Sequence, residues 1–179
     1  MLRKTFTLGL ITMLFATSMV AMYSYLPDYL SRKMNKHLSK VFSKEVVSVE
    51  IPVIDTAMIN HQLFKVVELD SVVGYSMISR ALGCKIGGCD NPNTDSQSFE
   101  QFFFMTAFDA HKNIKKVRVL EYTANHGYQI ANKGWLKQFE KGEKFEVGKN
   151  IDGISGATIS VKSITQGINN QIKVLKESL

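Results

Sequence analysis

The sequence predicts an α+β fold, an antiparallel sheet packed with helices and preceded by one N-terminal transmembrane helix. Three observations support this prediction. The chain begins with an uncharged apolar stretch, its middle is a series of strand patterns, and it ends with two amphipathic helix patterns. Strands followed by helices are typical of an antiparallel sheet with its helices on the faces. A chain of 179 residues has room for one domain and an anchor.

The apolar stretch covers residues 5–26 and contains no charged side chain. About 20 such residues span the hydrocarbon core of a bilayer. The alternative is a cleaved signal peptide, but Met19-Val20-Ala21 is a poor cleavage signal. We therefore expect an uncleaved anchor over residues 1–28, a basic juxtamembrane helix and linker over residues 29–60, and a domain over residues 61–179.

The net charge of +6 is concentrated at the N-terminal end. Residues 1–44 hold seven basic side chains and one acid, so the rest of the chain is balanced. Because this remaining part of the chain has no excess of positive charge, the net charge does not indicate binding to nucleic acid. We expect no nucleic-acid partner. Apolar residues recur at helical spacing in the basic segment, which predicts a helix lying on anionic lipid head groups. These residues are Leu30, Met34, Leu38 and Val41. A literal positive-inside count favours a cytoplasmic domain, so charge alone leaves the orientation open.

Five strand patterns follow the basic segment. Residues 46–53 are apolar and β-branched, and Pro52 favours an edge position. Two further strands, residues 63–69 and 72–80, flank Asp70-Ser71 and predict a hairpin. The phenylalanine-rich residues 99–108 predict a buried strand, and residues 114–122 alternate between apolar and basic side chains.

Two helices are predicted after the strands. The first covers residues 133–141, with Trp135, Leu136 and Phe139 on one side and Gly142 as a stop. The second covers residues 160–178 and has a continuous apolar stripe. This stripe is formed by Val161, Ile164, Ile168, Ile172 and Leu175.

The segment before the last helix carries the candidate site. Residues 152–160 read Asp-Gly-Ile-Ser-Gly-Ala-Thr-Ile-Ser, so small residues and hydroxyls lead into a helix start. Backbone N–H groups and the helix dipole make such a start favourable for an anion. The alternative is a helix cap formed by Ser155 or Thr158. The residues alone leave both interpretations open.

This segment resembles the flavinylation motif of the FMN-binding domain family. That family includes the G subunit of the Rnf electron-transport complex and the C subunit of the sodium-pumping NADH:quinone reductase. In the family, the last threonine of the motif receives FMN through a phosphoester, and Thr158 occupies that position. A weaker resemblance covers residues 63–174, including the segment 127–139. The sequence departs from the family at residues 124–127, where Ala-Asn-His-Gly stands in place of Glu-Thr-Pro-Gly, and in the insertion at residues 84–93.

The resemblance implies a covalent FMN on Thr158 and assigns expected roles to its neighbours. Asp152 is expected to be read by a flavin transferase that depends on FAD and magnesium. Ser160 is expected to act as a second phosphate ligand or as a helix-cap hydroxyl. The phosphate pocket is expected to be shaped by Ser155, Gly156 and Ala157, and the flavin ring to lie near Asn125, His126 and Tyr128.

The implied function is electron transfer by a flavoprotein without substrate turnover of its own. The transferase acts outside the cytoplasm, so the domain is expected on the periplasmic or extracellular side of a bacterial inner membrane, held by a single span. A membrane redox complex or reductase is the expected partner, together with membrane lipid. We expect no catalytic residue and no metal site. The alternatives are a regulatory or accessory FMN-binding module, and a structural domain whose motif is only a helix cap.

Two cysteines, Cys84 and Cys89, flank Lys-Ile-Gly-Gly. In an oxidising compartment this spacing favours a small disulfide loop. A metal site needs further ligands that the segment does not supply. A redox-active dithiol that exchanges electrons with the flavin remains an alternative.

Overall fold

The computed structural model describes residues 27–51, 61–85, 99–123 and 126–179. Within these ranges no helix combines the length and the apolar character needed to cross a membrane. The predicted anchor lies outside the described residues, and so do Pro52, Cys89 and Asn125. The anchor therefore stays a prediction.

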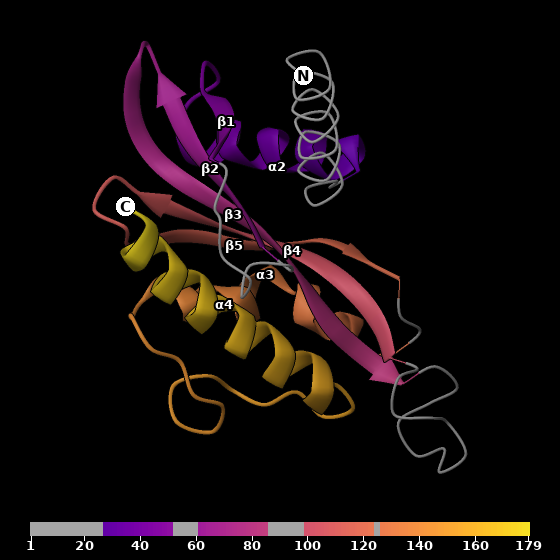
Figure 1. Cartoon of the computed structure of the whole chain (residues 1–179). Helices are drawn as coiled ribbons and strands as arrows, with labels where there is room; N and C mark the ends of the chain where they lie inside the picture. Colours follow the sequence, from indigo (N-terminus) through magenta and orange to yellow (C-terminus); the bar gives the residue numbers. More distant parts are fainter. Residues whose placement is uncertain (1–26, 52–60, 86–98, 124–125) are drawn as a thin grey trace, which may run out of the picture.

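A five-stranded antiparallel sheet forms the centre of the molecule, with its strands in chain order (Figure 1). The strands are β1 (Val47–Ile51), β2 (His61–Glu68), β3 (Ser71–Lys85), β4 (Phe99–Asp109) and β5 (Ile114–Tyr122). The predicted α+β class, the antiparallel sheet and the edge position of the first strand are confirmed. The hairpin between β2 and β3 is confirmed as well. Its turn lies at Leu69 and Asp70, both with positive φ, one residue earlier than predicted.

Helices cover both faces of the sheet, so the domain has two apolar layers (Figure 1). The long helix α4 (Thr158–Ser178) packs on one face, together with the short elements η2 (Tyr128–Ala131), α3 (Lys133–Leu136) and η3 (Lys137–Glu140). The fully buried rings Phe102, Phe104 and Phe108 of β4 point into this layer. The helix α2 (Asp28–Val41) packs on the opposite face.

The helix predicted in the basic segment exists, but its apolar stripe does not face lipid. Leu30, Met34 and Leu38 are each 1 % exposed or less and pack against the sheet. The prediction that this stripe lies on lipid head groups is therefore wrong, because the sheet offers the apolar partner. With β1 paired to β2 as well, the folded unit includes much of the segment predicted as juxtamembrane helix and linker.

The helix predicted over residues 133–141 is also different in the structure. One α-helical turn, α3, is followed by a 3-10 turn, η3, and η2 precedes them. Asn132 begins α3, since its side-chain oxygen accepts hydrogen bonds from the N–H groups of Gly134 and Trp135. The tighter 3-10 turn brings Phe139 edge-on to both Trp135 and Phe145. The chain therefore forms short helical turns that pack these rings together, and not the single longer helix that the apolar spacing predicts.

Candidate functional site

The site is built around the first turn of α4. Thr158 is the first helical residue and is exposed, and Ala157 stands at the N-cap position. The first intrahelical hydrogen bond runs from the N–H of Val161 to the carbonyl of Ala157. No side chain caps this helix end, so the alternative of a Ser155 or Thr158 cap is wrong. The N–H groups of residues 158–160 therefore have no carbonyl partner within the helix, and this helix end is favourable for a negative charge.

A tight turn leads the chain into this helix. The N–H of Ala157 donates to the carbonyl of Ile154 at 3.1 Å, and Gly156 has φ +75°. A turn with positive φ at its third residue is strained for any residue with a Cβ, which explains glycine at this position. The turn leaves Ser155 and Gly156 exposed and buries Ala157, which is 2 % exposed.

A hollow of about 260 Å³ lies beside this turn. Its wall combines the polar groups of Ser155 and Thr158 with the apolar side chains of its neighbours. The full lining consists of Val147, Gly153, Ile154, Ser155, Thr158 and Val161. Two of the predicted pocket residues, Ser155 and Thr158, line the hollow. Gly156 and Ala157 instead shape the turn and the helix start.

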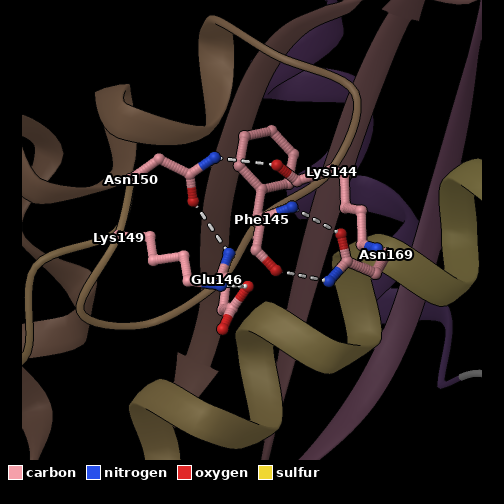
Figure 2. A network of polar contacts seen from close by, with 6 residues as sticks. All are labelled: Lys144, Phe145, Glu146, Lys149, Asn150 and Asn169. Carbon is pink, nitrogen blue, oxygen red and sulfur yellow. Dashed lines mark hydrogen bonds and ion pairs between the residues drawn. The ribbon is translucent and has the colours of Figure 1, made fainter.

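The loop that contributes Val147 is held rigidly to α4 (Figure 2). Asn169 of α4 bonds both backbone groups of Phe145. Its Oδ1 accepts from the Phe145 N–H at 2.9 Å and its Nδ2 donates to the Phe145 carbonyl at 2.8 Å. Asn150 closes the loop by bonding the N–H of Glu146 and the carbonyl of Lys144, each at 2.8 Å. The wall of the hollow is thus fixed relative to the helix that carries Thr158.

Two side chains also hold the backbone of Asp152 at the start of the motif. The indole Nε1–H of Trp135 donates to the Asp152 carbonyl at 2.9 Å. The Asp152 N–H donates to Oε1 of Gln138 at 2.8 Å. The carboxylate of Asp152 is exposed. This arrangement, here called the Asp152 clamp, presents the acid and fixes the segment leading to Thr158.

The opposite flank of the first turn is closed. The Tyr122 hydroxyl donates to the carbonyl of His126 and lies 3.0 Å from the Ser160 hydroxyl. Burial raises the pKa of Tyr122, which keeps this hydroxyl protonated. Gly127 lies in the same contact with φ +85°, and a Cβ there would be 2.7 Å from the Tyr122 oxygen. Tyr122, Ser160 and Ala157 therefore leave no room for a side chain at residue 127.

The structure corrects the predicted role of Ser160. Its side chain is 1 % exposed and is paired with Tyr122, and it does not cap α4. The periodicity of the helix explains this result, since residues 157, 160, 161 and 164 all face the sheet. Ser160 therefore joins the closed flank and does not line the hollow.

The predicted ring contacts lie near the first turn, on the closed flank. His126 is exposed and Tyr128 is 65 % exposed, and Gly127 between them contacts Ser160 and Ala157. Neither residue lines the hollow. Both side chains are free to contact a group that extends out of the hollow over the helix end.

The site suits a phosphorylated ligand that is only partly enclosed. N–H groups and hydroxyls are available for a phosphate, and Val147, Ile154 and Val161 offer apolar surface. Clefts that bury most of a ligand measure about 300–1,000 Å³, so this hollow is smaller than a complete flavin site. Among the described residues no group of three His, Cys, Asp or Glu side chains is placed to bind a metal.

Cys84 lies at the end of β3, is 2 % exposed and is disulfide-bonded. Its strand runs beside α4, where the Leu82 N–H donates to the Ser163 hydroxyl at 2.8 Å. Cys89 lies outside the described residues, so the predicted pairing stays a prediction.

Several residues of the site could not be identified from the sequence. Tyr122, Gln138 and Asn169 act through contacts with residues 14 to 38 positions away. The apolar spacing identifies Trp135 only as a helix residue and does not indicate that its indole N–H bonds the Asp152 carbonyl. The signal available in the sequence is a polar side chain at a position where the pattern predicts an apolar one, because a buried polar group needs a hydrogen-bond partner.

Comparison with known proteins agrees with this geometry. Residues 100–173 match the family model described as the FMN-binding domain. The match covers less than half of the chain and runs from β4 into the last turns of α4. It includes the Asp152 clamp, the hollow, the closed flank and Thr158. No curated protein gives a significant match. Residues 100–173 therefore match the FMN-binding domain family, and this match supports a flavin-binding module in this part of the chain.

Proposed function

We propose that this chain is a membrane-anchored, extracytoplasmic electron-transfer flavoprotein that carries FMN covalently through a phosphoester to Thr158. One observation carries the proposal. Thr158 is an exposed hydroxyl on the first residue of an uncapped helix, at the edge of the hollow, within the segment that matches the FMN-binding domain family.

Thr158 needs help to become a nucleophile. A threonine hydroxyl reacts poorly without a general base, and no His or Lys lines the hollow. A separate flavin transferase that uses FAD and magnesium would supply that base. The Thr158 oxygen then bonds to the phosphorus of the FMN half, the phosphoanhydride bond of FAD breaks, AMP leaves, and the hydroxyl proton passes to the transferase. The exposed carboxylate of Asp152 is positioned to be read by this enzyme.

The bound flavin would supply the redox chemistry, and the chain would hold and orient it. The N–H groups of residues 158–160 and the Ser155 hydroxyl would bind the phosphate. The hollow is too small for a whole flavin, so the ring would extend toward His126 and Tyr128 and stay accessible to a partner. An exposed ring on a covalent tether suits exchange of electrons with a membrane redox complex or reductase.

The same chemistry supports a location outside the cytoplasm. A flavin that dissociates outside the cytoplasm is not easily replaced, so a covalent bond is an advantage there. The uncharged residues 5–26 would form the anchor in a bacterial inner membrane. The transferase would then meet the domain on the periplasmic or extracellular side.

The test is flavin fluorescence of the full chain on a denaturing gel after coexpression with a flavin transferase. We expect fluorescence in the wild type, complete loss in Thr158→Val, and retention in Thr158→Ser, which keeps a hydroxyl. Intact mass should show the added FMN on the fluorescent forms only. An unmodified wild-type chain under these conditions would refute the covalent attachment.

A further inference from the structure

The face of the sheet opposite the flavin site carries a cluster of exposed cations. Arg32, Lys36 and Lys40 of α2 are spaced four residues apart and are exposed. Side chains at this spacing lie on the same side of a helix. The other side of α2 is buried through Leu30, Met34 and Leu38. The three cations therefore point away from the sheet.

The cluster continues onto the neighbouring edge of the sheet. Two contacts show that α2 runs antiparallel along β5. Lys33 Nζ donates to the carbonyl of Leu120 at 3.1 Å, and Lys115 Nζ lies 5.3 Å from the centre of the Phe42 ring. Residues 36–40 of α2 therefore lie beside the middle of β5, where Arg118 is located.

His37 reports how densely the cations are packed. Its pKa is lowered by burial first, and then by the charges of Arg118, Lys40, Lys133 and Lys36. The charges of cations from α2, β5 and α3 thus all disfavour the protonated form of this imidazole. We call Arg32, Lys36 and Lys40 of α2, with Arg118 of the neighbouring strand β5, the basic surface.

Acidic side chains do not neutralise the basic surface. The ion pairs found among the described residues involve other lysines, namely Lys116, Lys149, Lys173 and Lys176. The acids of α2 and β5 are Asp28 and Glu121, and both lie at the first turn of α2, where Glu121 bonds Tyr29. The positive potential of the surface is therefore available to an anionic partner.

We propose that the basic surface docks on the anionic phospholipid head groups of the membrane that holds the anchor. The charge is complementary, and lysines and arginines near such a surface are attracted to it. The position fits as well, because the uncharged residues 5–26 end directly before α2 begins at Asp28. This inference rests on the proposed anchor but not on the proposed flavin attachment.

Docking through the basic surface sets the orientation of the flavin. The helices α2 and α4 cover opposite faces of the sheet (Figure 1). With α2 against the head groups, the start of α4 and Thr158 face away from the bilayer. The flavin is then presented to a part of its partner that protrudes from the membrane.

The test uses energy transfer from Trp135, the only tryptophan of the chain, to dansyl-labelled lipid. The full chain is prepared without flavin transferase, so that no flavin quenches the donor, and is reconstituted into vesicles. We expect stronger transfer in phosphatidylglycerol vesicles than in phosphatidylcholine vesicles, and a decrease as salt is raised. Lys36→Gln/Lys40→Gln should lower the ratio of docked to undocked domain about 25-fold, or about fivefold for each cation.

The matched control is Lys65→Gln/Lys173→Gln, which removes the same charge from the other side of the sheet. Both lysines are exposed, and we expect transfer to stay at the wild-type level. Equal transfer in the two lipids, or an equal loss in both double variants, would overturn the proposal. Flotation with phosphatidylcholine vesicles tests the anchor separately, and gel fluorescence of the coexpressed chain tests the flavin.

Discussion

The two flanks of the first turn of α4 differ in how much of the helix end they leave open. On one flank, Tyr122, Gly127 and Ser160 are in mutual contact and leave no room for a Cβ at residue 127. On the other, Ser155 and Thr158 border a hollow of about 260 Å³. The closed flank fixes the helix end, and the open flank leaves N–H groups and a hydroxyl accessible. A rigid but uncapped helix end is a suitable acceptor for a phosphate.

Glycine substitutions test this difference most strongly. Gly127→Ala places a Cβ 2.7 Å from the Tyr122 oxygen at φ +85°, so both backbone strain and a clash result. We expect the free energy of unfolding to fall by about 2–4 kcal/mol, measured by denaturant titration of the full chain in detergent.

Gly153→Ala is the matched control on the open flank. A Cβ at Gly153 meets nothing within 4 Å, so we expect a change within about 0.5 kcal/mol. Equal losses in the two variants would show that the flanks do not differ in packing.

Removing one oxygen tests the hydrogen bonds of the closed flank. Tyr122→Phe deletes the hydroxyl that bonds the His126 carbonyl and leaves the buried Ser160 hydroxyl without this partner. We expect a loss of about 1–2 kcal/mol in unfolding free energy. In Tyr122→Phe/Ser160→Ala both partners are absent, so the double variant should lose less than the sum of the single variants. Strict additivity would contradict the contact.

The Asp152 clamp belongs to the open flank and should affect modification more than stability. Trp135→Phe keeps an aromatic ring but removes the N–H that bonds the Asp152 carbonyl. We expect about 1 kcal/mol lower stability, seen by circular dichroism, and several-fold slower flavinylation by the transferase, seen by intact mass over time.

Gln138 offers a pair of variants that separates positioning from folding. Gln138→Glu keeps an oxygen acceptor for the Asp152 N–H, whereas Gln138→Met removes it. Flavinylation should be slow in the methionine variant and close to normal in the glutamate variant. If both variants are modified at the wild-type rate, the clamp has no role in presenting Asp152.

The sequence predicts those parts of the fold and the site that depend on local patterns. Alternation and helical spacing predict the five strands and α4, whereas the small residues before Thr158 leave a capped and an open helix start equally possible. The features that the sequence does not predict are those that depend on which part of the molecule a given side chain packs against. The stripe of α2 is the same for lipid and for a sheet, and only the fold shows that Leu30, Met34 and Leu38 meet the sheet. The identity of Ser160 does not show which flank its hydroxyl faces. The orientation of α4 against the sheet places it on the closed flank, beside Tyr122.

The far half of α4 supplies the smallest expected effect and a control for the whole comparison. Gln171 of α4 is fully buried and donates to the Ser79 hydroxyl, which also lies 2.5 Å from Nδ1 of His61. Burial lowers the pKa of His61, so the unfolded chain binds a proton more readily than the folded chain. Stability is therefore constant above the ordinary histidine pKa of about 6.5 and falls as the pH is lowered through that value.

His61→Gln should remove this contribution to the acid sensitivity, as measured by unfolding at pH 5 and pH 8. Flavinylation measured at pH 8 should stay at the wild-type rate in this variant, because His61 is connected to α4 only through Ser79 and Gln171, more than three turns beyond Thr158. A variant that unfolds with the wild-type pH profile would show that the pKa of His61 is the same in the folded and the unfolded chain. One that is flavinylated slowly would show that the first turn of α4 depends on distant packing as well as on its own two flanks.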